Sequence, residues 1–279
     1  MNNAQGDFWG IRRPDGRVGI RDYLLAVPSV VCAQRAAAQA VNGLPQGVAL
    51  AHPVGCAQIG ADRELTRSIL VGMGSHPNVR GTVVVGLGCE GVPAAEVGAD
   101  IAELGVPVSV VTIQSEGGTE EAGQAAANIL RQWAVPSVSR TRVPIHELVL
   151  GLGDIENLGV QGEAIIEALQ ARGGRVVAAS AEERGTSAAL TALAAQGVHL
   201  IVEQCDASHV GGHPIVPVVR WGYQPDLARA LGDDWDGLVG ERTPDQWVDW
   251  LLSIASGELT AAEQLGAVTF AIGRRGPTL

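Results

Sequence analysis

Cysteines end three successive apolar runs in the first third of the sequence. The run LLAVPSVVC ends at Cys32, VALAHPVGC contains His52 and ends at Cys56, and VVVGLGC ends at Cys89, which Glu90 follows. If these runs form neighbouring parallel strands, all five side chains meet at the carboxyl edge of one sheet, where open α/β folds bind ligands. Thiolates select soft or borderline metals such as iron and zinc, and three protein ligands leave one coordination position for a substrate.

Packing is the alternative role for each of these residues taken alone. Free cysteine is among the most buried residue types, and His52 could be no more than a hydrogen-bonded histidine at a strand end. Gly55 and Gly88 stand just before the second and third cysteine. Because glycine lets backbone amides approach an anion or a metal-bound ligand closely, this pattern favours a shared site.

The third cysteine lies within GLGCEG at residues 86–91, which has the spacing of a dinucleotide-binding loop. That loop normally follows the first strand of its domain and requires an acidic residue after the next strand. Here the loop follows the third strand, and the next run offers only Glu116, in a glycine-rich loop. We therefore expect a ligand loop in which Cys89 coordinates metal and Glu90 transfers protons or orients the site. A nucleotide-dependent oxidoreductase is the less favoured alternative.

Lysine is absent from the sequence, so all 19 Lys or Arg positions are arginines. This excludes Schiff-base chemistry, lysine-bound pyridoxal phosphate and the Walker A lysine. Arginine scarcely releases its proton, so a general base must be His, Asp, Glu, Tyr or Cys. Arginine can instead clamp a carboxylate through two parallel hydrogen bonds.

Composition narrows the class of protein. The formal net charge of -11 argues against a nucleic-acid partner. No apolar run reaches the roughly 20 residues that span a bilayer, and the first residues contain no apolar signal-peptide core. We therefore expect a cytoplasmic protein with no membrane partner. The 4 cysteines are too few for a disulfide scaffold.

Short apolar runs alternate with amphipathic segments, which predicts an α/β fold of two Rossmann-like halves with mainly parallel sheets and crossover helices. We place the halves at residues 1–143 and 144–279, with a linker at 140–144. The expected strands are 23–31, 48–52, 82–87, 106–113, 148–152, 175–179, 198–202 and 216–219. The expected helices are 33–41, 62–72, 94–104, 119–134, 160–172 and 186–195, and a further helix begins near Thr243.

Several stretches resemble the UxaA family of sugar-acid dehydratases, which includes altronate and galactarate dehydratases and is related to the large subunit of sulfolactate sulfo-lyase. The matching stretches are RPDGRVGIRDYLLAVPSVVCA, HPVGCAQ, HPNVRGTVVVGLGCE, TIQSEGGT and, near the end, GGHPIVPVVRWGYQPDLARAL. The resemblance covers most of the chain and is most specific between Arg13 and Thr119.

The resemblance implies β-elimination from a small hydroxy acid such as a sugar acid or a sulfo-hydroxy acid. Its cofactor would be iron, as mononuclear Fe2+ or an iron–sulfur cluster, or else Mn2+. Cys32, Cys56 and Cys89 would hold the metal, which acts as a Lewis acid. His52 would be the base or acid, with Glu90 as the partner acid or as an orienting group.

Further residues are expected to bind the substrate. Arg21 would pair with a substrate carboxylate, and Gln114, Gly117, Gly118 and Thr119 match a Gln-x-x-Gly-Gly-Thr loop of the family.

The second half holds another polar cluster, in EQCDASHVGGHP, whose default interpretation is a solvated loop. The cluster consists of Cys205, Asp206, His209 and His213.

Two departures from the family pattern leave a second hypothesis open. LGLGDIENLG stands where family members have a Cys-Gly-Gly-Ser-Asp segment, and the small histidine-bearing N-terminal domain is missing. Either a small subunit supplies that domain to this chain, or the chain is a non-catalytic or regulatory homologue that binds an acidic metabolite. We also expect a homo-oligomer.

Overall fold

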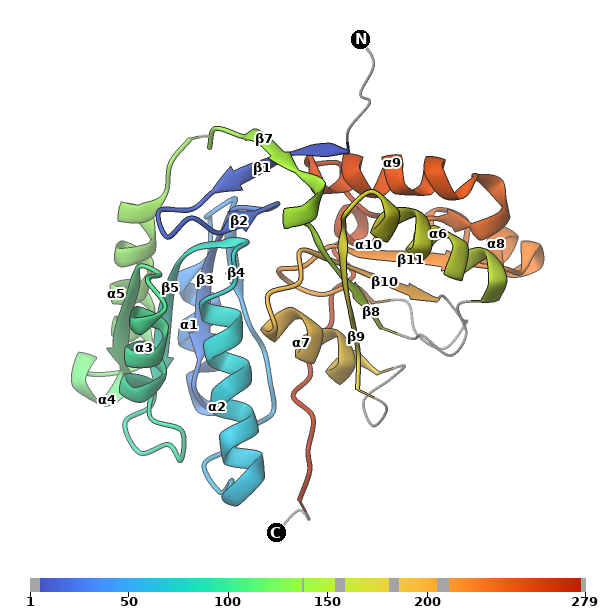
Figure 1. Cartoon of the computed structure of the whole chain (residues 1–279). Helices are drawn as coiled ribbons and strands as arrows, with labels where there is room; N and C mark the ends of the chain where they lie inside the picture. Colours follow the sequence, from blue (N-terminus) through green and yellow to red (C-terminus); the bar gives the residue numbers. More distant parts are fainter. Residues whose placement is uncertain (1–5, 137, 154–158, 181–185, 205–210, 277–279) are drawn as a thin grey trace. The chain divides into compact units, whose positions relative to one another are not determined.

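The computed structural model describes residues 6–136, 138–153, 159–180, 186–204 and 211–276 (Figure 1). The chain folds as two compact units. Unit 1 comprises Met1–Arg12, Val18–Ile20 and Ser139–Thr269, and unit 2 comprises Arg13–Arg17, Arg21–Val138 and Phe270–Leu279. Each unit has a parallel sheet with crossover helices, which confirms the predicted fold class. The linear division at residues 143 and 144 stays a prediction about domain organisation.

Unit 2 contains a four-stranded parallel sheet in the order β4-β3-β5-β6. Its strands are β3 (Tyr23–Pro28), β4 (Gly47–Ala49), β5 (Val79–Gly86) and β6 (Val108–Thr112). Its helices are η1 (Val31–Ala33), α1 (Gln34–Ala40), α2 (Gly60–Gly74), α3 (Ala94–Glu103), α4 (Ile113–Glu116) and α5 (Thr119–Trp133).

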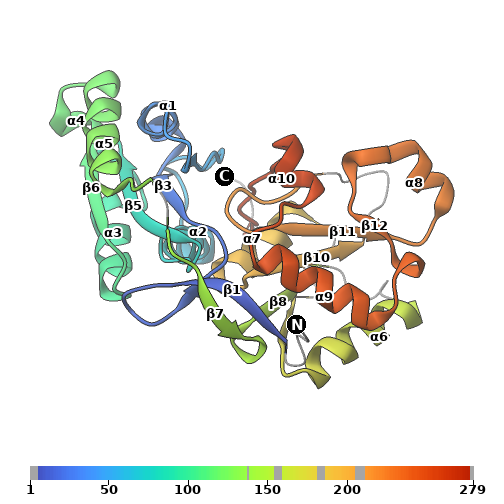
Figure 2. The ribbon, with the colours of Figure 1, turned by 90° about the horizontal axis from the view of Figure 1, so that it is seen from above.

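Alternating side chains of β3 and β5 build the unit 2 core on both faces of the sheet. Leu24, Ala26, Val83 and Val85 point to one face and pack against alanine-rich α1 and α5, whose small side chains let the helices come close to the sheet. Intervening residues such as Val84 are fully buried as well. The other face is covered by α2 and α3, as Figure 2 shows. Burial on both faces explains why these strands are continuous apolar runs.

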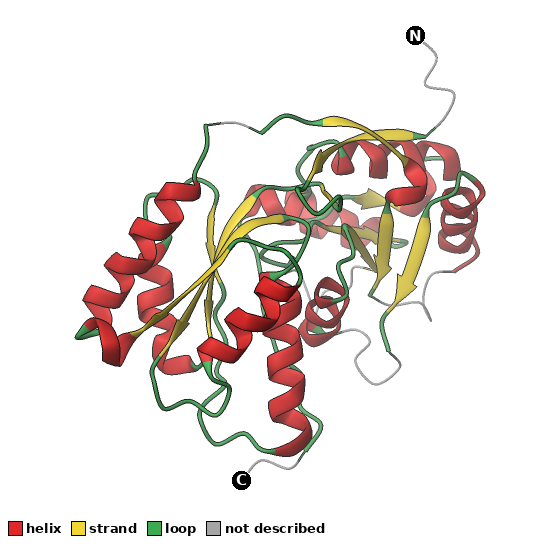
Figure 3. Ribbon diagram, turned by 60° about the vertical axis from the view of Figure 1, so that its left-hand side comes forward, coloured by secondary structure: helices red, strands yellow, loops and turns green. Residues whose placement is uncertain are grey.

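Unit 1 contains a five-stranded parallel sheet in the order β12-β11-β10-β8-β9. Figure 3 draws the strands of the molecule in yellow. Its strands are β8 (Val149–Leu152), β9 (Arg175–Ala178), β10 (Leu200–Gln204), β11 (Val218–Gly222) and β12 (Gly237–Leu238). Its helices are η2 (Ile145–Glu147), α6 (Gly159–Ala171), α7 (Ser187–Ala195), α8 (Pro225–Leu231), η3 (Gly232–Asp234), η4 (Val239–Glu241), α9 (Pro244–Ala255) and α10 (Ala261–Leu265). Trp221 and Trp247 are fully buried and meet edge to face, with ring centroids 5.5 Å apart.

A small antiparallel sheet, β2-β1-β7, completes unit 1 and corrects one prediction. Its strands are β1 (Asp7–Arg12), β2 (Val18–Gly19) and β7 (Thr141–Pro144). Residues 140–144 were predicted to be a linker, but β7 pairs with β1 over four residues. The partner strand lies about 130 positions earlier in the sequence, so local composition did not reveal the pairing.

The strands and helices that we predicted are all present, with ends displaced by a few residues. Gly105 (φ +79°) and Gly173 (φ +99°) lie just beyond α3 and α6 in backbone conformations that favour glycine. Thr243 caps α9 by accepting a hydrogen bond from the N–H of Gln246, as its sequence predicted. Within the described residues, no helix combines the length and the apolar character needed to cross a membrane.

Candidate functional site

The carboxyl edge of the unit 2 sheet carries all three predicted cysteine ligands. Cys32 lies in η1 after β3, Cys56 lies in the loop after β4, and Cys89 lies in the loop after β5. Because β4, β3 and β5 are parallel neighbours, the three loops leave the same edge of the sheet. All three thiols are free and exposed. The strands are therefore neighbours, as the shared-edge hypothesis requires.

Backbone contacts connect the three loops. Val31 donates its N–H to Val54 O at 2.8 Å, which joins the loop after β3 to the loop after β4. A Cβ atom on Gly91 would lie 2.7 Å from Cys56 O, so glycine allows the loop after β5 to pass close to the loop after β4. The sheet edge is therefore a connected surface of three loops.

The thiols do not form a ready metal site in this arrangement. Among the residues that the structure describes, no three His, Cys, Asp or Glu side chains are placed to hold a metal ion. A metal shared by Cys32, Cys56 and Cys89 therefore stays a prediction.

Glu90 accepts four hydrogen bonds in the loop after β5. Its Oε2 accepts from the N–H groups of Leu87 at 3.1 Å and Gly88 at 2.6 Å. Its Oε1 accepts from Ser29 Oγ at 3.1 Å and from the N–H of Ala94, the first residue of α3, at 3.2 Å. Burial raises the pKa of Glu90, but the hydrogen bonds outweigh burial, and the pKa is lowered overall. This geometry favours the orienting role of Glu90 over proton transfer.

The Glu90 carboxylate also discriminates between the two interpretations of GLGCEG. In a dinucleotide-binding loop, N–H groups of the loop and of the following helix bind the pyrophosphate. Here the N–H groups of Leu87, Gly88 and Ala94 are bound to the carboxylate of Glu90. The loop is thus folded around its own anion, which argues against a nucleotide site.

The glycines of this loop make room for side chains of the chain itself. A Cβ atom on Gly86 would collide with Glu90 Oε1, and one on Gly88, whose φ is +117°, would collide with Gln114 Oε1. No heavy atom lies within 4 Å of a Cβ built on Gly55. We expected Gly55 and Gly88 to admit a ligand; at Gly88 the close neighbour is instead Gln114.

His52 is buried, and both of its ring nitrogens have partners. Nε2 lies 2.7 Å from Pro28 O, and Nδ1 accepts the N–H of Val54 at 3.3 Å. Because a carbonyl oxygen only accepts, Nε2 carries the proton and the ring is neutral. Burial lowers the pKa of His52 despite the hydrogen bond to Pro28. The geometry matches a structural histidine at a strand end, and its catalytic role stays a prediction that requires it to release Pro28.

The predicted substrate loop follows β6, the neighbour of β5, and so lies at the same sheet edge. Gln114 donates its N–H to Leu87 O at 3.2 Å, which joins this loop to GLGCEG. Gly117 (φ +94°) and Gly118 (φ +154°) separate α4 from α5, which begins at Thr119. The structure therefore brings Gln114 against the GLGCEG loop and the other three residues to the same sheet edge, and the role of all four in substrate binding stays a prediction.

Arg21 is not brought to the cysteines. It precedes β3, whereas Cys32 follows β3, so the two residues flank opposite ends of a strand about 17 Å long. The Arg21 side chain is buried, and its backbone N–H and carbonyl bond to Asn78 and Arg13. The predicted pairing of Arg21 with a substrate carboxylate has no support from this position.

Ser29 is a residue of the site that sequence reasoning missed. It follows directly on β3, is buried, and donates its hydroxyl to Glu90 Oε1 at 3.1 Å. The sequence signal that could have revealed Ser29 was a hydroxyl-bearing residue directly after a buried strand.

The polar cluster of the second half is described only in part. Cys205, Asp206 and His209 lie outside the described residues, as do residues 154–158 of the segment that replaces the Cys-Gly-Gly-Ser-Asp motif. His213 is buried, and burial lowers its pKa to about 3.

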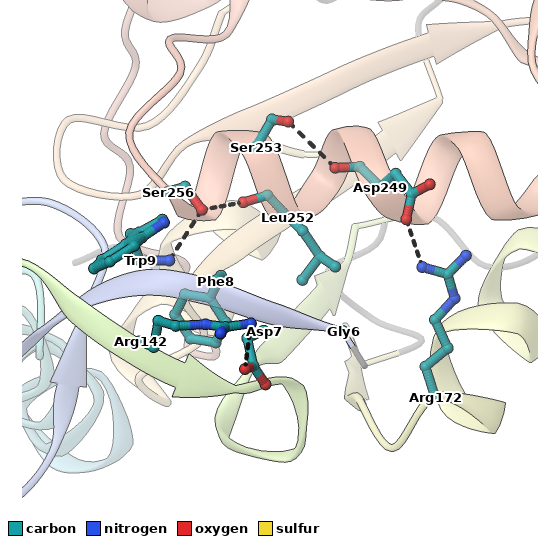
Figure 4. A pocket seen from close by; sticks show the side chains of 10 residues that line it. All are labelled: Gly6, Asp7, Phe8, Trp9, Arg142, Arg172, Asp249, Leu252, Ser253 and Ser256. Carbon is teal, nitrogen blue, oxygen red and sulfur yellow. Dashed lines mark hydrogen bonds and ion pairs between the residues drawn. The ribbon is translucent and has the colours of Figure 1, made fainter. Parts of the chain in front are cut away.

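Unit 1 contains a cavity of about 480 Å³, shown in Figure 4. Its lining consists of Gly6, Asp7, Phe8, Trp9, Arg142, Arg172, Asp249, Leu252, Ser253 and Ser256. Arg142 pairs with Asp7 at 3.0 Å, and Arg172 pairs with Asp249 at 2.6 Å. Carboxylates therefore neutralise both guanidinium groups of the lining. The cavity includes none of the residues predicted to carry the chemistry.

Comparison with known proteins matches residues 10–136 to the family described as D-galactarate dehydratase/Altronate hydrolase, second domain. The matched segment contains the whole unit 2 sheet and its three cysteines. The resemblance noted from the sequence is therefore confirmed for this segment.

Three relatives extend the comparison. Altronate dehydratase of Bacillus subtilis is 31% identical over 162 residues, and altronate dehydratase of Escherichia coli is 39% identical over 89 residues. The (2R)-sulfolactate sulfo-lyase subunit beta of Chromohalobacter salexigens is 40% identical over 80 residues. The Bacillus match covers 54% of this chain and 32% of the relative. The Chromohalobacter match covers 29% of this chain and 21% of the relative. The Escherichia match covers 28% of this chain and 18% of the relative. The chain thus matches at most about a third of each relative's length.

Proposed function

We propose that this chain, whose residues 10–136 match the family described as D-galactarate dehydratase/Altronate hydrolase, second domain, acts as a lyase, or as part of one, on a small hydroxy acid. The observation that carries this proposal is the set of three exposed thiols on adjacent loops of the family segment. The named relatives act on a sugar acid or on sulfolactate. Both ligands are small anions that carry a carboxylate and a hydroxyl group.

The proposed reaction is a β-elimination. A base removes the proton from the carbon next to the carboxylate, and the neighbouring carbon loses its leaving group together with the bonding electron pair. The resulting enol becomes a 2-oxo acid. The leaving group is hydroxide, which leaves as water after protonation, or sulfite in the case of sulfolactate.

The residues of the unit 2 edge have distinct parts in this proposal. Glu90 and Ser29 hold the loop that presents Cys89. Gln114 and the loop after β6 line the proposed substrate site. We propose that Cys32 and Cys56 join Cys89 in binding iron, which would supply Lewis-acid chemistry. The identity of the base stays open between His52, after release of Pro28, and a residue of a partner.

Two measurements test the proposal. Protein purified anaerobically is incubated with D-galactarate, D-altronate and (2R)-sulfolactate, and 2-oxo acid is measured, with sulfite as a second product of sulfolactate. The same preparation is analysed for iron, manganese and acid-labile sulfide. We expect one acid to be converted and iron to be bound. No product from any of the three acids, in the presence of bound metal and of an added small subunit, would contradict the lyase.

A binding role is the second candidate. It is favoured by His52 and Glu90, whose polar atoms are all engaged in structural hydrogen bonds. A chain that binds one of the acids and converts none of them would support this role.

We also propose that the lyase works with a small subunit. The name of the Chromohalobacter relative, which is a subunit, supports this proposal. Activity that appears only after a histidine-bearing small subunit is added would support a two-component enzyme.

A further inference from the structure

The last described segment of the chain returns to unit 2 and lies against the Cys56 loop. In unit 1, the N–H of Gly212 donates to Ala267 O at 2.6 Å, and the carbonyl of Gly212 accepts from the N–H of Thr269 at 2.9 Å. These two hydrogen bonds fix the chain just before this segment. Residues 270–276, here called the strap, belong to unit 2. In Figures 1 and 3 the last described residues of the chain approach the start of α2.

Two contacts anchor the strap. The Phe270 ring lies 6.4 Å from the His52 ring, measured between centroids. Farther along, Asp62 Oδ1 accepts the N–H groups of Arg275 at 2.6 Å and Gly276 at 3.2 Å. His52 lies near the start of the loop that contains the exposed Cys56, and Asp62 lies in the first turn of α2, which follows that loop. The strap therefore runs from one end of the cysteine loop to the other.

The strap carries two adjacent arginines, Arg274 and Arg275, to this sheet edge. Both are exposed, and within the described part of the chain neither guanidinium forms an ion pair. Their situation differs from that of Arg67, which is bound to Glu96 at 3.0 Å and to Asp100 at 2.7 Å. In a chain of net charge -11, two adjacent exposed arginines that form no ion pair within the described residues are suited to bind an anion.

We propose that Arg274 and Arg275 bind the carboxylate of the anionic substrate at the Cys56 loop, and that Asp62 positions them by holding the strap backbone. The inference rests on the proposed function for the identity of the anion. It supplies the cationic partner that Arg21, at the opposite end of β3, is not placed to provide. A planar guanidinium binds a carboxylate through two parallel hydrogen bonds, which also orients the acid.

The test compares Arg274→Gln, Arg275→Gln and the double variant with the unchanged chain. Arg131→Gln is the matched control, because Arg131 is exposed in the last turn of α5 and so lies toward the other end of the sheet. Binding of D-galactarate, D-altronate and (2R)-sulfolactate is measured by calorimetry, and turnover is measured where it occurs. We expect the double variant to raise Kd or KM roughly tenfold or more, with kcat within about threefold and no change in the control.

The Asp62 variants separate positioning from charge. Asp62→Ala keeps both arginines and their charge but removes the acceptor of the strap N–H groups. We expect it to raise Kd and to speed amide hydrogen exchange at Arg275 and Gly276. Asp62→Asn keeps one acceptor oxygen and should restore part of both properties.

The outcomes distinguish this inference from the proposed function. If the acids bind and the double variant weakens binding, but no acid is converted even with the small subunit added, the arginine clamp stands and the lyase fails. If turnover and affinity are unchanged in the double variant, the lyase stands and the clamp is wrong. Failure of the unchanged chain to bind any of the three acids would overturn the clamp as well.

Discussion

Replacement of Glu90 by glutamine tests the interpretation that this carboxylate organises the cysteine-bearing loop. Glutamine keeps one acceptor oxygen and turns an NH2 group toward donors, so two of the hydrogen bonds from Leu87, Gly88, Ala94 and Ser29 are lost. Hydrogen bonds to charged groups contribute about 1.5 kcal/mol or more each, and partial exposure of Glu90 reduces the sum. We therefore expect Glu90→Gln to lower the free energy of unfolding of unit 2 by about 2 kcal/mol at neutral pH.

The assay is urea unfolding combined with hydrogen exchange of residues 86–94, because a chain of two units need not unfold in one step. Glu116→Gln, an exposed change on α4, is the control and should have little effect. The lowered pKa of Glu90 gives the pH dependence its sign: its contribution is present above the ordinary pKa of 4.5 and is lost as the pH falls below that value. A loss under about 0.5 kcal/mol, or a difference that does not shrink in acid, would refute the reasoning.

Further predictions concern a buried histidine and two glycines. Burial lowers the pKa of His199 from 6.5 to about 4, so folding stability should fall by about 3 kcal/mol as the pH drops through this window, and His199→Gln should flatten the change in urea unfolding. Gly86→Ala should destabilise unit 2 by about 1–3 kcal/mol, because the new Cβ meets Glu90 and lies 2.7 Å from Ala94 Cβ. Gly55→Ala, with no atom within 4 Å, is its control in thermal unfolding and should change little. Equal effects of the two alanines would contradict the packing argument.

The parallel sheets could be predicted from the sequence because their strands are buried on both faces. Continuous apolar runs such as TVVV are typical of strands that are covered on both faces. Gly105, just after α3, indicated where that helix ends. The antiparallel strands were missed for the opposite reason. β1 and β7 are short, partly exposed and far apart in sequence, so their pairing depends on a contact that local patterns do not encode.

The site was predictable to the level of the sheet edge and no further. Strand order placed Cys32, Cys56 and Cys89 on neighbouring loops, as expected. The four hydrogen bonds of Glu90 and the two of His52 depend on distances between loops, which residue types do not determine. The strap was missed because its anchor, Asp62, lies more than 200 residues before Arg275.

The central claim, that the cysteine-bearing edge of unit 2 performs elimination on a hydroxy acid, is tested most directly by one comparison. The chain and its Cys89→Ser variant are purified anaerobically and assayed for 2-oxo acid formed from D-galactarate, D-altronate and (2R)-sulfolactate. The small subunit is added if activity requires it. Serine keeps nearly the same volume but loses the soft donor, so we predict that the variant folds, loses bound iron and loses turnover together. Full turnover in Cys89→Ser would contradict the claim.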